Sequence, residues 1–117
     1  MSEVEELVRR FVDATMEKAE MHGARKDHRL YEEMRRAFQG LRATEEGRRA
    51  FRALLEHPSA EVRVWVAGQL LAEGDASVIG VVEEISKGEG LLAFSAQMTL
   101  QEYRKGSLGP PFPAITK

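Results

Sequence analysis

Three histidines carry the side chains best suited to metal binding or to acid–base catalysis near neutral pH: His22, His28 and His57. A helical metal site needs ligands on one face, such as two histidines four residues apart or a glutamate three residues before a histidine. None of the three has a histidine four residues away or a glutamate three residues before it. The sequence therefore predicts no metal site and no histidine base.

Glutamates occur in adjacent pairs, and carboxyl groups of this kind are common general acids and bases. The pairs are Glu5-Glu6, Glu32-Glu33, Glu45-Glu46 and Glu83-Glu84. Adjacent residues on a helix point about 100° apart, so the two carboxylates of each pair diverge. The sequence indicates no catalytic dyad, and we expect a protein that is not an enzyme.

Gly88, Gly90 and Ala93 fit the spacing of a dinucleotide-binding turn. Such a turn must follow a strand, because the pyrophosphate lies where the strand meets the next helix. A helical pattern precedes Gly88 instead, and no acidic residue stands about 20 positions further on. We interpret this segment as a loop between helices and predict no cofactor.

The composition is that of a globular domain in a reducing compartment. Of 117 residues, 43% are hydrophobic and 31% are charged, which suits one core and is too apolar for intrinsic disorder. The absence of cysteine excludes disulfides and thiolate metal sites. The acidic start lacks the pattern of a signal peptide, and no apolar run approaches the length of a membrane span. We expect a cytoplasmic protein.

Six segments place apolar residues every three or four positions, the spacing of one helix face. The predicted helices cover residues of about 3–21, 28–43, 45–57, 60–73, 76–87 and 92–105. Start and stop residues bound them: caps at Ser2, Thr44, Ser59 and Asp75, a stop at Pro58, and closing glycines at Gly23, Gly74 and Gly106. No segment alternates with a period of two, so we predict an all-α fold without a sheet.

The fourth and sixth predicted helices repeat one another at an offset of 30 residues. Val62, Val66 and Leu70 correspond to Leu92, Ala96 and Leu100. Stacked helix pairs show such repeats. We therefore expect three antiparallel pairs in a short α–α superhelix, forming a single domain over residues 1–106 and leaving residues 107–117 as an extended proline-rich tail.

The segment from Val62-Arg63 to Leu70 resembles the second helix of a HEAT repeat. In the second copy, Ala93 stands where the HEAT family has arginine. Residues 4–106 resemble a group of small bacterial HEAT-like proteins called domain of unknown function 2019. The features that carry this resemblance are Leu7-Val8 with Phe11, residues 54–58 with Val62-Arg63, and Ala96, Met98-Thr99-Leu100, Tyr103 and Gly106. It implies a HEAT-like fold and no activity, and members of such a group are plausible immunity proteins that block bacterial toxins.

Several side chains lie away from the predicted buried faces. They are Trp65 and Gln69 on the fourth helix, Phe94 and Met98 on the sixth, and Arg35 and Arg36 on the second. Tryptophan, phenylalanine and methionine are common anchors at protein interfaces, so these six residues are the candidate partner-binding site. Two alternatives stay open: neighbouring helices cover these side chains, or the tail folds Phe112 onto Met98.

Protein binding is accordingly the predicted function, with an unidentified partner such as a toxin and with the chain as a monomer or weak dimer. The alternative is nucleic-acid binding by residues 25–52, which hold nine Lys or Arg against five Asp or Glu, as the concave face does in HEAT-like DNA glycosylases. The net charge of −2 and the interleaved carboxylates disfavour that alternative. The same basic bias could steer a charged protein partner.

Overall fold

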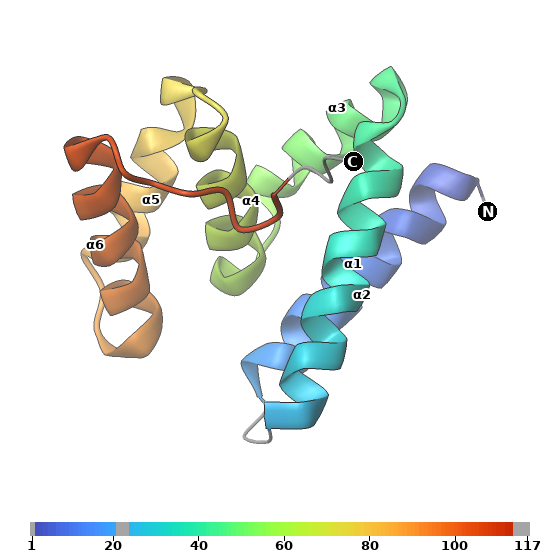
Figure 1. Cartoon of the computed structure of the whole chain (residues 1–117), viewed down its shortest axis with the longest axis horizontal. Helices are drawn as coiled ribbons and strands as arrows, with labels where there is room; N and C mark the ends of the chain where they lie inside the picture. The colour runs from blue at the N-terminus through green and yellow to red at the C-terminus, as the bar shows by residue number, and fades with distance from the viewer. Residues whose placement is uncertain (1, 21–23, 114–117) are drawn as a thin grey trace. The chain divides into compact units, whose positions relative to one another are not determined.

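The computed structural model describes residues 2–20 and 24–113, and these residues form six α-helices and no strand (Figure 1). The helices are α1 (Glu3–Ala19), α2 (Ala24–Arg42), α3 (Glu45–Ala53), α4 (Ala60–Ala72), α5 (Ile79–Ser86) and α6 (Gly90–Lys105). A 3₁₀ turn, Leu54–Glu56, follows α3, and a second, Ala76–Val78, precedes α5. The predicted all-α fold is confirmed.

The local signals that bound the helices act as predicted. Ser2 and Glu5 form a reciprocal capping box, with both N–H···O distances at 3.1 Å. The Gly47 N–H donates to Thr44 Oγ1 at 3.0 Å. Gly106 closes α6 at φ 75°, a left-handed conformation that favours glycine. Gly23, predicted to end the first helix, lies outside the described residues.

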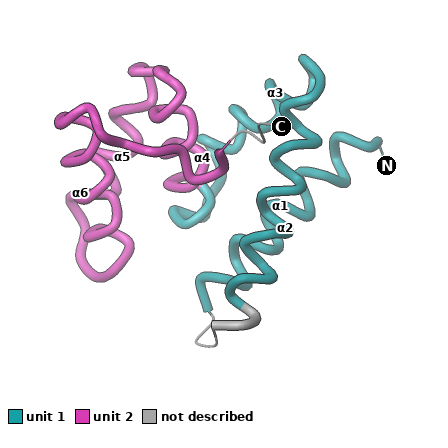
Figure 2. Tube along the Cα trace, viewed as in Figure 1, with its two compact units in different colours: residues 1–62 teal, residues 63–117 magenta. Residues whose placement is uncertain are grey.

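The chain divides into two compact units, Met1–Val62 and Arg63–Lys117 (Figure 2). The boundary falls within α4. The predicted single domain and the superhelix both concern how all the helices are arranged together, and they stay predictions.

In the first unit, α1 and α2 run antiparallel and pack along each other (Figure 1). Three phenylalanines form an aromatic cluster in its core. The Phe51 ring lies 5.4 Å from Phe11 in an edge-on arrangement and 4.9 Å from Phe38 in a tilted one. Each ring is at least 97% buried, so this cluster ties α3 to the α1–α2 hairpin.

The start of α3 approaches the backbone at the end of α2 very closely. Gly47, on the first turn of α3, is buried against the end of α2. A Cβ atom at Gly47 would lie 2.0 Å from the carbonyl oxygen of Leu41. Only glycine fits this approach, because the obstructing atom belongs to the backbone.

In the second unit, α5 packs against α6. Val82 and Ile85 on α5 are buried, as are Ala93, Ala96 and Leu100 on α6. These residues belong to the faces that helical periodicity predicts as apolar. Within the described part of the chain, no helix is both long and apolar enough to cross a bilayer.

Candidate functional site

Helix α6 has two apolar faces, of which only one is covered. Its buried face carries Ala93, Ala96 and Leu100. At 100° per residue, Leu91, Phe94 and Met98 lie on roughly the opposite side of the helix. Their exposed fractions are 87%, 59% and 39%, and we call these three residues the α6 stripe. The prediction that Phe94 and Met98 point away from the buried seam is confirmed.

The α6 stripe concentrates exposed apolar surface on one helix. Among the described residues, four large apolar side chains are exposed, and three of them form the stripe. The fourth, Met16, lies on α1. Residues at positions i, i+3 and i+7 are the usual anchors when a helix docks into a groove of another protein.

Polar side chains border the α6 stripe. Ser95 and Gln101 on α6 are exposed, as are Glu89 before its first residue and Lys105 at its end. An apolar centre within a polar rim is the usual anatomy of a protein–protein interface. The site predicted from sequence includes Phe94 and Met98 and omits Leu91, although Leu91 lies on the same face by the same helical spacing.

The expectation that Gln69 offers an open surface is wrong. Its side chain is 99% buried. Gln69 Oε1 accepts a hydrogen bond from the Phe112 N–H at 2.8 Å, and Gln69 Nε2 donates to Glu73 Oε2 at 2.6 Å. The C-terminal tail covers this residue, and helical periodicity within α4 holds no information about the tail.

Trp65 is half-buried by the same tail. Its ring stacks on Phe112 with the centroids 5.5 Å apart and the planes 25° from parallel. Phe112 itself is fully buried. The alternative in which Phe112 folds onto Met98 is therefore wrong: the tail brings Phe112 to α4, and Met98 stays exposed on α6.

Arg35 and Arg36 differ in their exposure and in their contacts. Arg35 Nη2 lies 2.8 Å from Glu32 Oε2, and this side-chain hydrogen bond lowers the pKa of Glu32 and raises the pKa of Arg35. Arg36 is exposed and lines a groove of about 400 Å³ between α1 and α2. The six predicted site residues thus lie on three helices, with Trp65 and Gln69 together at Phe112 and with Phe94 and Met98 together on α6.

The groove between α1 and α2 holds charges of both signs. Three arginines and three carboxylates line it: Arg9, Arg10, Arg36, Asp13, Glu17 and Glu33. An anion site needs an excess of positive charge. The balance in this groove therefore selects neither a phosphate nor a cation.

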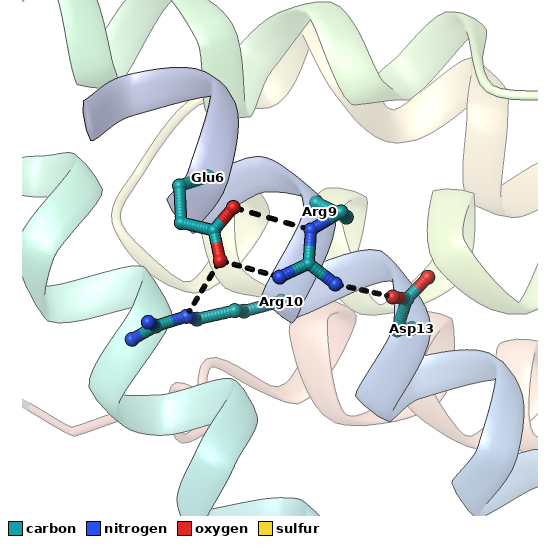
Figure 3. A network of polar contacts seen from close by, with 4 residues as sticks. All are labelled: Glu6, Arg9, Arg10 and Asp13. Carbon is teal, nitrogen blue, oxygen red and sulfur yellow. Dashed lines mark hydrogen bonds and ion pairs between the residues drawn. The ribbon is translucent and has the colours of Figure 1, made fainter. Parts of the chain in front are cut away.

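A network on α1 accounts for part of this balance (Figure 3). Glu6 accepts hydrogen bonds from Arg9 and, at 3.3 Å, from Arg10, while Arg9 also donates to Asp13 at 3.1 Å. All four residues belong to one helix, at spacings of three or four. The hydrogen bond from Arg9, with smaller contributions from both arginine charges, lowers the pKa of Glu6 below its ordinary value of 4.5.

This network makes stability depend on pH through Glu6. A carboxyl whose pKa is depressed on folding stabilises the folded state above its ordinary pKa of 4.5, and that contribution is lost as the pH falls through the lower folded value. We expect wild type to have a higher urea midpoint than Glu6→Gln at pH 7, and we expect this difference to be smaller at an acidic pH well below 4.5. The control is Glu3→Gln, which alters an exposed glutamate outside the network. An equal difference at both pH values contradicts the assignment.

Several arginines of the basic segment 25–52 are engaged in contacts within the protein. Arg49 Nη2 lies 2.5 Å from Glu45 Oε1. The Arg42 guanidinium lies over the Phe38 ring, 5.5 Å from its centroid. These contacts, with that of Arg35, engage guanidinium groups that a phosphate backbone would need.

The described histidines do not assemble a site. His28 is exposed, and His57 Nδ1 accepts a hydrogen bond from the Ser59 N–H at 3.0 Å. His22 lies outside the described residues. In the ranges 2–20 and 24–113, no group of three or more His, Cys, Asp or Glu residues is arranged to hold a metal ion.

Comparison with known proteins places the chain in a family. The model of a family described as Domain of unknown function (DUF2019) matches residues 5–103, which confirms the resemblance predicted from sequence. No curated protein and no solved structure is significantly similar to the chain. Because the match covers most of the chain, this protein belongs to the family of domain of unknown function 2019.

Proposed function

We propose that this protein is a non-enzymatic, cytoplasmic protein-binding domain that contacts its partner through the α6 stripe. The observation that carries the proposal is the exposure of Leu91, Phe94 and Met98 along one face of α6. Phenylalanine and methionine are adaptable apolar anchors. An apolar stripe on an otherwise polar surface is typical of a site that another protein covers.

The free energy gained by burying the α6 stripe is suited to the centre of a protein–protein interface. Fully burying a leucine, phenylalanine or methionine that starts fully exposed contributes about 1.5–3 kcal/mol. Leu91 is close to that limit, whereas Phe94 and Met98 are already partly buried and contribute less. Association costs several kcal/mol in lost translational and rotational freedom, so polar contacts around the stripe must add to it. We infer an interface of the size usual for stable protein–protein complexes, with the α6 stripe at its centre.

The sharpest form of this proposal is an immunity protein that occupies and blocks a surface of a toxin. A domain of this kind needs no catalytic group, and the bias of charge along the chain would speed its encounter with a charged partner. The nucleic-acid alternative is supported less well, because ion pairs and ring contacts engage arginines of the basic segment.

Capture from a lysate of the native host tests the α6 stripe. Tagged wild type, Phe94→Glu and Met16→Glu serve as baits, and bound proteins are quantified by mass spectrometry. We expect Phe94→Glu to retain at least about tenfold less of the partner, since a charge must then be buried in the interface. Met16→Glu is the matched control, because it alters an exposed methionine outside the stripe.

Two results would contradict the proposal. One is retention of every captured protein by Phe94→Glu at the wild-type level. The other is equal loss with Phe94→Glu and Met16→Glu, which would show only a general effect of added charge. For the toxin form, the captured partner expressed alone should arrest growth, wild type should restore it, and Phe94→Glu should fail to restore it.

A further inference from the structure

The C-terminal tail buries a phenylalanine in a site on α4. Residues 107–113 follow the last helix and form no helix of their own. Phe112 is nevertheless fully buried, with its ring stacked on Trp65 at a centroid distance of 5.5 Å. The flanking Pro110 and Pro113 are exposed. The tail therefore inserts one aromatic side chain and leaves the neighbouring prolines at the surface.

The side chain of Gln69 binds the backbone of the tail. Its Oε1 atom accepts the Phe112 N–H at 2.8 Å, while its Nε2 atom donates to Glu73 Oε2 at 2.6 Å. The bond to Glu73 directs the amide oxygen of Gln69 toward the tail. A buried acceptor satisfied by a peptide N–H fixes the position of an extended chain whatever its other side chains are.

Gly68 lies beside Pro111, the proline that precedes Phe112. A Cβ atom added at Gly68 would lie 3.7 Å from Pro111 Cγ, which is ordinary van der Waals contact. Proline also restricts the backbone before binding, which lowers the entropy lost when the segment is ordered. Trp65 thus supplies an aromatic platform, Gln69 supplies a hydrogen-bond acceptor, and Gly68 borders the proline. An aromatic platform is the common feature of readers of proline-rich peptides.

We propose that Trp65, Gly68 and Gln69 form a peptide-binding site that takes an extended segment containing a proline-flanked phenylalanine, with the tail as its resident ligand. The ligand class is read from the occupant, Pro-Pro-Phe-Pro at residues 110–113. The site is separate from the α6 stripe and does not depend on the function proposed there. Since a tethered segment acts at an effective concentration of order mM, a peptide in trans must compete with the tail.

Trp65 provides a direct probe, because it is the only tryptophan in the chain. Full-length wild type and full-length Phe112→Ala are titrated with the peptide Ser-Leu-Gly-Pro-Pro-Phe-Pro, which is residues 107–113, while tryptophan emission is recorded. The matched control is the same peptide with alanine in place of phenylalanine. We expect the peptide to bind Phe112→Ala saturably and to bind wild type at least about tenfold more weakly. We expect the control peptide to bind neither protein.

The proposal is overturned if Phe112→Ala keeps its helical circular dichroism yet shows no saturable change with the peptide. It is also overturned if Phe112→Ala loses its helical signal, because Phe112 is then a core residue and not a ligand. Adding Gln69→Leu to Phe112→Ala should weaken peptide binding at least about fivefold by removing the acceptor at similar volume. Unchanged binding by that double variant would overturn the assignment of the site to Gln69.

Discussion

Replacing Gly47 with alanine is expected to lower the free energy of unfolding by about 3 kcal/mol or more. The added Cβ would lie 2.0 Å from the carbonyl oxygen of Leu41. A flexible side chain could rotate out of the way, whereas relieving this clash requires α2 and α3 to separate. Urea unfolding followed by far-UV circular dichroism measures the loss.

Gly80→Ala is the matched control for Gly47→Ala. Gly80 also lies in a helix, α5, but a Cβ atom there would have no neighbour within 4 Å. Alanine is a better helix former than glycine, so we expect Gly80→Ala to raise stability by about 0.5–1 kcal/mol. Similar effects of both substitutions would show that the approach of Gly47 to Leu41 is not what limits that position.

Truncating Phe51 to alanine is expected to cost about 3–5 kcal/mol. The Phe51 ring contacts both Phe11 and Phe38 and is 97% buried. Its removal therefore creates a cavity among the aromatic rings and eliminates two ring–ring contacts. Chemical denaturation measures the change, and the cooperativity of the transition shows whether the two units unfold together.

Phe94→Ala is the control for Phe51→Ala, because it removes the same ring from an exposed position. Phe94 is 59% exposed on α6, so we expect its truncation to change stability by no more than about 0.5 kcal/mol. A loss comparable to that of Phe51→Ala would place Phe94 in the core and remove the α6 stripe as a binding surface. A stable Phe94→Ala variant that binds its partner less well would assign Phe94 to function and not to folding.

The amino-acid sequence determined the helices and their faces, because both depend on residues within a few positions of one another. The Ser2–Glu5 capping box and the left-handed Gly106 were predictable, since each acts within one turn. The nearly opposite placement of Phe94 and Ala96 on α6 follows from about 100° per residue. Leu91 obeys the same geometry, and its exposure was equally open to prediction.

The tertiary structure decided what covers each face, because that depends on contacts between residues far apart in the chain. The hydrogen bond from Phe112 to Gln69 spans 43 residues and turned a predicted surface residue into a buried one. The approach of Gly47 to Leu41 depends on the angle between two helices, which apolar periodicity does not encode. Local periodicity therefore shows which side chains share a face, while the path of the rest of the chain decides whether that face meets protein or water.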